Sequence, residues 1–287
     1  MGNSVYFNGQ IIPAEQACVS VFDSAVLHGA SAFTTMLARG GRVFRLPAHL
    51  ARLMQTVERL GLRNDTDAAT LERACSDVLA ANELADARMR ITLSPGSVHG
   101  GAATTVVTAE PLPQYPHDWY ESGLTVMIAP FRQNVEDPTC GYKTGCYFPR
   151  MLARQHAAAA GADEALWYTP ASHLAEACFC NVFLAIEGKL CTPPLNTPVL
   201  PGIVRSAVLE LARRLAIPCD DQTPLTVKEM LAAKEIFLTS STSGIRPVAR
   251  VERHGVGDEK PGELTRRLMD AYESLLAAEC GPAREAT

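Results

Sequence analysis

The chain begins with short apolar runs, and further along it apolar residues recur at the spacing of a helix. Two such runs, at residues 5–7 and 10–12, flank Asn8-Gly9, and that arrangement is typical of a β-hairpin with a two-residue turn. From Pro47 onward, leucine and valine recur every three or four residues, which predicts an amphipathic helix. The elements expected over this part of the chain are hairpins at 5–12 and 33–44, helices at 47–60 and 68–82, and strands at 88–93 and 104–108.

Three prolines interrupt this pattern within residues 110–117. Proline fixes φ and lacks an N–H donor, so the run predicts a linker rather than a helix or an inner strand. We place an N-terminal α+β domain at 1–113, the linker at 114–122 and a C-terminal α/β domain at 123–287. Both halves mix strands and helices, which assigns the chain to the α+β class in a mixed α/β arrangement. Expected after the linker are strands at 124–129, 164–168 and 235–239, a hairpin at 181–192, and helices at 147–160, 203–215 and 261–276.

The composition narrows the possible function classes. A net charge of −5 and a pI near 5.8 leave no basic surface for nucleic acid. No apolar run reaches membrane-spanning length and the N-terminus lacks signal-peptide features, so we expect a cytoplasmic protein without a membrane partner. The nine cysteines form no CxxC pair, which favours reduced thiols. We expect no bound metal, because His173, Cys178 and Cys180 lack a fourth ligand and zinc-finger spacing.

Lys143 is the first candidate for chemistry. It lies between two glycines, in Gly141-Tyr142-Lys143-Thr144-Gly145, just before an alanine-rich segment that we expect to be helical. A surface lysine at a helix start is the simpler interpretation of this position taken alone, although a helix N-terminus disfavours cations. The rest of the sequence has to decide between the two interpretations.

Four other features favour a cofactor that carries a phosphate and a protonated ring nitrogen. Glu176 lies among small and apolar residues, and a buried carboxylate there needs a partner such as a protonated pyridine. The helix expected after Pro201-Gly202 has no capping side chain, so its N–H groups are free for a phosphate. The hydroxyl-rich run 239–243, and Arg52 beside an apolar helix stripe, are further anion-binding candidates. Each feature alone is explained as well by a surface acid, a helix start or a polar turn.

These features occur together and in order, and in this the chain resembles the class IV aminotransferases, the fold-type IV enzymes that use pyridoxal 5′-phosphate (PLP). That family includes branched-chain and D-amino-acid aminotransferases, (R)-amine transaminases and aminodeoxychorismate lyase. The resemblance implies a two-domain fold similar to D-amino-acid aminotransferase, with PLP bound between the domains, and a homodimer. It covers nearly the whole chain, in the segments FNGQIIP, RVFRLPAHLARL, KTGCYFPRMLARQHAAAAGADEAL, AEACFCNVF, LPGIVR, IFLTSSTSGIRPV and GDEKPGELTRRL.

The resemblance implies cofactor roles for seven residues. Lys143 matches the catalytic lysine that carries PLP as a Schiff base, in a ping-pong exchange between an amino donor and a 2-keto acid. Glu176 matches the acid on the pyridine nitrogen, and Arg52 and Ser241 match ligands of the cofactor phosphate. The remaining matches are the backbone N–H donors of Ile203 and Val204, and Tyr147, which aligns after a one-residue gap with a tyrosine on the phenolic oxygen of PLP.

The substrate is defined less clearly than the cofactor. Arg90 lies where branched-chain enzymes have an arginine, so it is a candidate for the substrate carboxylate, with a solvent-facing strand residue as the alternative. The loop at 96–101 contains no arginine, and therefore lacks both the carboxylate-binding pattern of D-amino-acid aminotransferase and the arginine of the lyase. The residues that the family places near the substrate are His28, Phe33, Thr35, Arg90, Thr242 and Ser243.

Four functional hypotheses remain at this point. The first is an aminotransferase that moves an amino group between a small amino acid or amine and a 2-keto acid. The second is aminodeoxychorismate lyase, which forms 4-aminobenzoate and pyruvate and is favoured by Thr35 and by the Glu-Ala-Cys run at 176–178. A non-catalytic PLP-fold protein is disfavoured, because the lysine and the acid are both present. A cysteine hydrolase using Cys178 or Cys180 has no supporting pair of histidine and acid.

Overall fold

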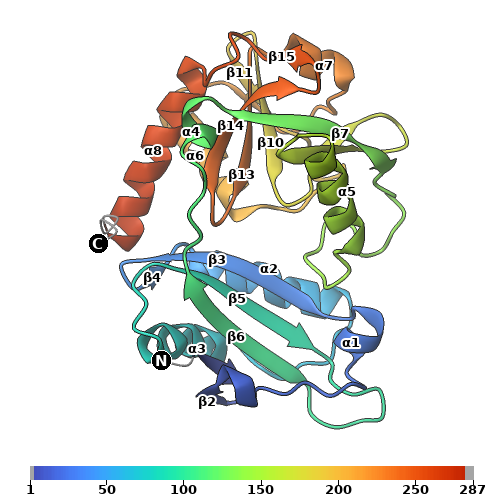
Figure 1. Ribbon diagram of the computed structural model, residues 1–287, viewed down its shortest axis with the longest axis vertical. Coiled ribbons are helices and arrows are strands. Elements are labelled where there is room, and N and C mark those ends of the chain that lie inside the picture. The colour runs from blue at the N-terminus through green and yellow to red at the C-terminus, as the bar shows by residue number, and fades with distance from the viewer. Residues whose placement is uncertain (1–2, 282–287) are drawn as a thin grey trace. The chain divides into compact units, whose positions relative to one another are not determined.

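The computed structural model describes residues 3–281, and the chain divides into two compact units (Figure 1). Unit 1 is Met1–Pro113 with Tyr142–Cys146 and Leu275–Thr287, and unit 2 is Gln114–Gly141 with Tyr147–Ser274. The boundaries expected from the sequence differ from these units, because they assign 142–146 and the end of the chain to the second domain. The spacing of apolar and polar residues within a short segment does not indicate that residues 142–146 join a unit formed by much earlier residues.

Unit 1 is built on a six-stranded antiparallel sheet in the order β2-β1-β6-β5-β3-β4. The two hairpins expected from the glycine signals are present. Asn8 and Gly9 both have positive φ, 47° and 98°, as a two-residue type I′ turn requires. Gly40-Gly41 turns the second hairpin between paired Arg39 and Arg42. The strands are β1 Ser4–Phe7, β2 Gln10–Pro13, β3 Ala32–Arg39, β4 Arg42–Val43, β5 Ala87–Ser94 and β6 Thr104–Pro111.

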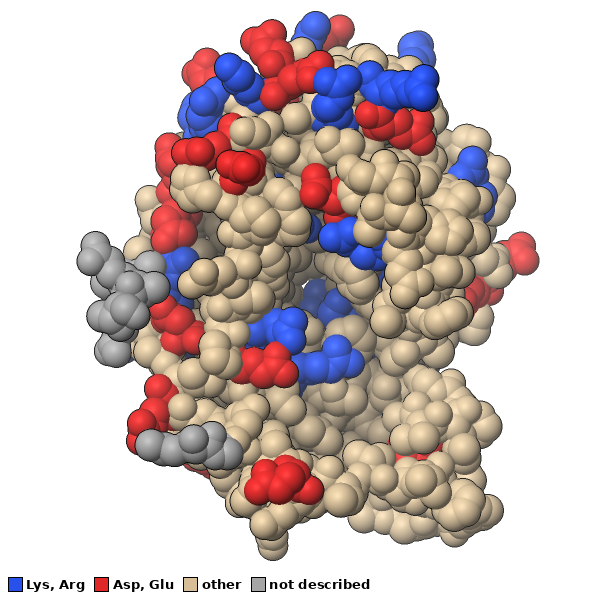
Figure 2. All heavy atoms as spheres, viewed as in Figure 1, with Lys and Arg blue, Asp and Glu red and all other residues tan. Residues whose placement is uncertain are grey.

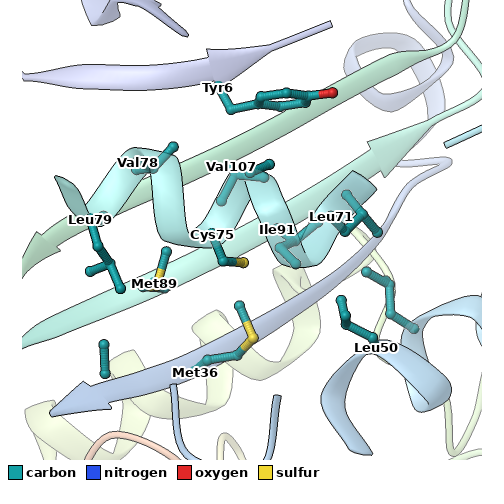
Figure 3. Packing of buried hydrophobic residues seen from close by; sticks show 14 of the residues in the cluster. Tyr6, Met36, Leu50, Leu71, Cys75, Val78, Leu79, Met89, Ile91 and Val107 are labelled. Carbon is teal, nitrogen blue, oxygen red and sulfur yellow. The ribbon is translucent and has the colours of Figure 1, made fainter. Parts of the chain in front are cut away.

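Two helices, α2 (Leu46–Arg59) and α3 (Ala68–Ala81), pack on this sheet and close the core of unit 1. Figure 3 shows Cys75 of α3 gathered with Met36 and Ile91 of the sheet. A short 3-10 helix (Ala14–Gln16) and α1 (Ser24–His28) complete the unit. Burying this apolar cluster is the main favourable term in folding the unit.

Unit 2 contains a nine-stranded mixed sheet in the order β12-β11-β10-β13-β14-β7-β8-β9, with β15 paired to β14. The parallel pairs are β7 with β8, β14 with β7, and β11 with β12. The strands are β7 Leu124–Arg132, β8 Glu164–Tyr168, β9 Leu174–Ala177, β10 Asn181–Ile186, β11 Lys189–Cys191, β12 Cys219–Asp220, β13 Glu235–Ser240, β14 Gly244–Val251 and β15 His254–Gly255.

Helices accompany this sheet along its length. Helix α5 packs on β7 and β8, and α6 packs on β13. Most of the buried strand side chains are apolar, and the rings of Phe183 and Phe237 stack with their centroids 5.0 Å apart. The helices are α4 Asp118–Glu121, α5 Phe148–Ala159, α6 Ile203–Arg214, α7 Val227–Ala232 and α8 Glu263–Cys280, of which α8 belongs to unit 1 from Leu275 onward.

Strand β14 is the principal element that the sequence pattern did not predict. It spans Gly244–Val251, and seven of its eight residues are paired with β13, β7 or β15. Pro247 lies inside it, and proline ordinarily argues against an inner strand because it cannot donate to the ladder. The register between β14 and β7 shifts between Val248 and Arg250, and this irregularity follows directly after the proline.

Charged side chains of both signs are mixed over the end of unit 2 that holds β11, β15 and α7 (Figure 2). Two ion pairs on this surface join Arg250 to Glu259 and Lys189 to Asp220. Such exposed pairs stabilise the protein by only about 0–1 kcal/mol each. Within residues 3–281, every helix is too short or too polar to span a lipid bilayer.

Candidate active site

The Lys143 segment is held against the first residues of β3. Phe33 N donates to Lys143 O at 2.9 Å, and Gly145 N donates to Ser31 O at 2.8 Å. Gly145 is required for this approach, because a Cβ atom there would lie 2.4 Å from Ser31 Oγ. The backbone of Lys143 is therefore fixed by the sheet of unit 1, while its side chain is only half-buried.

Three of the residues expected near the substrate lie on one face of that sheet with the lysine. Phe33 and Thr35 are two residues apart on β3, so their side chains point to the same face. Arg90 is paired with Thr35 across the sheet, and its guanidinium carbon lies 3.6 Å from the centroid of the Phe33 ring. Lys143 Nζ lies 4.7 Å from the same centroid. His28, in contrast, is the last residue of α1 and is exposed.

Arg52 is held by a small buried network in unit 1. Its Nη2 atom donates to Thr34 Oγ1 at 3.2 Å, and Thr34 Oγ1 lies 2.8 Å from His49 Nδ1. Burial, reinforced by the positive charges of Arg52 and Lys143, holds the pKa of His49 well below its ordinary value. The imidazole is therefore neutral and accepts the Thr34 hydroxyl proton, which leaves the hydroxyl oxygen to accept from Arg52.

Glu176, in unit 2, is a buried carboxylate with partners on both oxygens. Its Oε1 accepts from Arg150 Nη2 at 2.5 Å, and its Oε2 accepts from Leu200 N at 3.0 Å and from Asn181 Nδ2 at 3.3 Å. The side chain of Glu176 is only 6% exposed. Strand β9 positions the acid, and the segment leading into α6 contacts it directly.

The start of α6 presents backbone N–H groups that the N-cap residue does not bind through a side chain. Gly202 is the N-cap and supplies no side-chain cap, and the first turn carries no acid. A Cβ at Gly202 would lie 1.9 Å from Asn181 Oδ1, so only glycine allows the helix to begin this close to the Glu176 network. The N–H groups of Ile203 and Val204 lie in this first turn, where the helix dipole favours an anion.

The hydroxyl-rich turn after β13 is held by two tyrosines that the sequence analysis did not identify. Tyr115 Oη lies 2.8 Å from Thr242 Oγ1, and Tyr120 Oη donates to Ser243 O at 3.0 Å. Ser240 Oγ and Ser243 Oγ lie 2.6 Å apart inside the turn. The segment expected to be a linker therefore positions this turn, and Ser241 lies within it, half-buried.

Tyr147 precedes α5 and stacks on Phe179, with ring centroids 5.8 Å apart. The guanidinium carbon of Arg150 lies 5.8 Å from the Tyr147 ring. Tyr147 is thus placed beside the ion pair of Arg150 and Glu176.

The geometry disfavours a cysteine nucleophile. Cys178 accepts from Trp167 Nε1 at 3.4 Å, and burial, with the nearby charge of Glu164, raises the pKa of its thiol to about 12. Cys180 accepts from Arg246 Nη2 at 2.8 Å and is also buried. A thiol that remains protonated is a poor nucleophile and a poor metal ligand. Across residues 3–281, no three side chains of His, Cys, Asp or Glu converge on a metal position.

Besides the two tyrosines at the hydroxyl-rich turn, sequence reasoning missed three residues that hold Glu176 and Arg52 in place. Arg150 pairs with Glu176, while Thr34 and His49 hold Arg52. His49 and Arg52 are three residues apart on α2, a spacing that places two side chains on the same helix face and was available as a signal. Arg150 lies in the first turn of α5, where a cation is disfavoured, so its presence there was also informative.

Comparison with known proteins gives one family. The family model described as amino-transferase class IV matches residues 31–251. A putative branched-chain-amino-acid aminotransferase of Methanocaldococcus jannaschii is 28% identical over 278 residues, covering 94% of this chain and 96% of that protein. A D-alanine aminotransferase of Bacillus licheniformis is 25% identical over 281 residues, with 96% and 98% covered.

Solved structures agree in fold. The crystal structure of Escherichia coli branched-chain amino acid aminotransferase superposes with a TM-score of 0.91 at 25% identity, covering 99% of this chain and 97% of that chain. The T.th. branched-chain amino acid aminotransferase with pyridoxamine 5′-phosphate gives a TM-score of 0.90 at 24% identity, with 98% and 95% covered.

Proposed function

Because the chain belongs to the class IV aminotransferases, we propose that it uses PLP to move an amino group between a small amino acid or amine and a 2-keto acid. The observation that carries this proposal is the buried Glu176 carboxylate beside the uncapped start of α6. A carboxylate for a protonated ring nitrogen and free N–H groups for a phosphate are the two anchors that PLP requires.

The residues present fit PLP by the chemistry of their donors. In unit 2, Glu176 would bind the pyridine nitrogen, and the N–H groups of Ile203 and Val204, with Ser241, would bind the phosphate. In unit 1, Arg52 would add a charged phosphate ligand, since Thr34 and His49 already hold its guanidinium. Tyr147 is the candidate for the phenolic oxygen. Lys143 Nζ supplies the amine that holds the cofactor aldehyde.

PLP, when bound, supplies the electron sink that makes the Cα–H bond of an amino acid acidic. Lys143 then has a second task, which is to take the Cα proton at Nζ and to return it. Arg90 provides the cation for a substrate carboxylate on the face that also carries Phe33 and Thr35. The Phe33 ring lies in contact with both cations and gives this face an apolar floor, which suits a small donor.

A panel of donors tests the substrate class. We expect D-alanine, L-leucine or (R)-1-phenylethylamine to bleach the yellow PLP-bound protein, because donation of the amino group converts the cofactor to its amino form. The measurement is the loss of the visible absorption band, with the released keto acid or ketone quantified. Aminodeoxychorismate is the fourth member of the panel.

The alternative, an aminodeoxychorismate lyase, is favoured by the position of Thr35, half-buried on the Phe33 face. Pyruvate released from aminodeoxychorismate, with no bleaching by any of the three other donors, would establish the lyase. Bleaching by any one of them leaves the transaminase proposal standing.

We also propose that the chain works as a homodimer, because unit 1 exposes four large apolar side chains within residues 21–27. Val21 is 69% exposed, Val26 is 58% exposed, and Phe22 and Leu27 lie beside them. Val98 N donates to Phe22 O at 3.0 Å, which joins the loop at 96–101 to this surface. We expect light scattering to give twice the chain mass, and Val26→Asp to shift the protein towards the monomer, whereas Glu72→Gln on exposed α3 should not. A monomeric wild-type protein at micromolar concentration contradicts the proposal.

A further inference from the structure

Arg150 occupies a costly position that its contacts explain. Its side chain is 19% exposed and lies in the first turn of α5, where the helix dipole disfavours a cation. Nη1 donates to Ala177 O at 3.0 Å and to Cys178 O at 3.3 Å, while Nη2 binds Glu176. The guanidinium also lies 5.8 Å from the ring centroid of Trp167. These hydrogen bonds and the ring contact hold the guanidinium in one position, which indicates that it binds a specific partner.

That partner is Glu176. Arg150 fixes the plane of the carboxylate from the Oε1 side, and Leu200 and Asn181 fix it from the Oε2 side. A carboxylate oxygen has two lone pairs, so acceptor capacity remains for one more donor. Three protein donors therefore pre-orient the acid without saturating it.

The charge of Arg150 matters as much as its geometry. A buried carboxylate without a cation is strongly disfavoured, and removal of one member of such a pair leaves the other uncompensated. Burial opposes the charged form of Arg150, but the charge and hydrogen bond of Glu176, together with Tyr147 and Cys178, hold the pKa of the guanidinium above its ordinary value. The Arg150 guanidinium is therefore positively charged before any ligand arrives.

We propose that Arg150 is a positioning residue for PLP. Arg150 orients Glu176 and sets how strongly this acid holds the proton of the pyridine nitrogen. The proposal rests on the proposed function of Glu176. A carboxylate shared with a guanidinium attracts a second proton donor less strongly than an unshared one, because part of its charge is already neutralised. Arg150 therefore lowers the attraction between Glu176 and the pyridine proton, but it also fixes the position of the carboxylate. We expect the loss of this fixed position to dominate when Arg150 is replaced. Arg150 acts on the cofactor only through Glu176.

A double-mutant cycle tests this directly. Equilibrium titration of the apo-protein with PLP gives the dissociation constant for the wild type, Arg150→Met, Glu176→Gln and the double variant. We expect Arg150→Met to weaken PLP binding about 10-fold to 100-fold, the range typical for residues that orient a ligating group in metal sites. In the Glu176→Gln background the same change should alter the constant less than about threefold, because the charged partner is gone. Equal effects in both backgrounds would overturn the proposal.

Spectra and matched variants distinguish an effect of Arg150 on the orientation of Glu176 from a general effect on the folding of the protein. The absorption spectrum of bound PLP and its pH dependence should shift in Arg150→Met but not in Arg154→Met, one turn further along α5. If Arg150→Met does not fold, Arg150→Lys and Arg150→Gln replace it in the experiment. The lysine variant keeps the positive charge beside Glu176 and should bind PLP more tightly than the glutamine variant. Equal binding by the two variants contradicts the proposal. A wild-type protein that fails to bind PLP contradicts the proposed function itself, whereas normal wild-type binding with an uncoupled cycle contradicts only the role of Arg150.

Discussion

Replacing Lys143 by alanine is expected to lower transaminase activity by at least about 10⁴-fold and to remove the yellow colour of the PLP-bound protein, because one side chain provides both the covalent attachment and the proton transfer. Activity with the best donor from the panel and the visible absorption spectrum measure the two effects. Borohydride treatment of the wild type, followed by peptide mass analysis, should place the reduced cofactor on residue 143.

The variant should fold, because the contacts that hold this segment are made by its backbone. Phe33 N donates to Lys143 O and Gly145 N to Ser31 O, and Thr144 forms a bridge with Ala32. None of these bonds uses the lysine side chain. The matched control is Lys228→Ala on α7, which removes an exposed lysine and should keep full activity. A Lys143→Ala protein that stays yellow and active would remove Lys143 from the mechanism.

The sequence predicted the sheet of unit 1 well because its signals are local. The Asn8-Gly9 and Gly40-Gly41 turns fix which residues pair across two hairpins, and period-two burial then continues along β5. Helix α2 was likewise expected from leucine spacing and begins within one residue of the predicted start. In each case a run of fewer than fifteen residues carried the information.

Elements and contacts that depend on distant parts of the chain could not be read in this way. Strand β14 contains Pro247, which local rules disfavour, and its pairing with β7 joins residues more than a hundred positions apart. The contact between Arg150 and Glu176 spans 26 positions and joins a helix to a strand. The resemblance to the family implied the roles of Lys143 and Glu176 toward PLP, but it did not indicate which protein residues hold either side chain.

Glu176→Gln is expected to reduce the turnover number about 10²-fold to 10⁴-fold, the usual contribution of a well-placed group to proton movement. Glutamine keeps the shape of glutamate, and its amide oxygen can still accept from Leu200 N. It carries no charge, however, and it cannot hold a proton on the pyridine nitrogen, so the electron sink is weakened. The measurement is the turnover number with saturating donor and PLP, together with the absorption spectrum of the bound cofactor.

The control for Glu176→Gln is a second carboxylate in the same unit that makes a similar number of bonds. Glu235 accepts from Leu264 N at 3.1 Å, Thr265 N at 2.7 Å and Thr265 Oγ1 at 2.6 Å, and so caps the start of α8. Glu235→Gln should cost stability, about 1 kcal/mol for a weakened cap, and leave the turnover number unchanged. If the two variants behave alike, with turnover preserved within about threefold in both, then Glu176 serves only to bind Arg150 and the start of α6. A large loss confined to Glu176→Gln would instead show that its remaining lone pair is used during turnover.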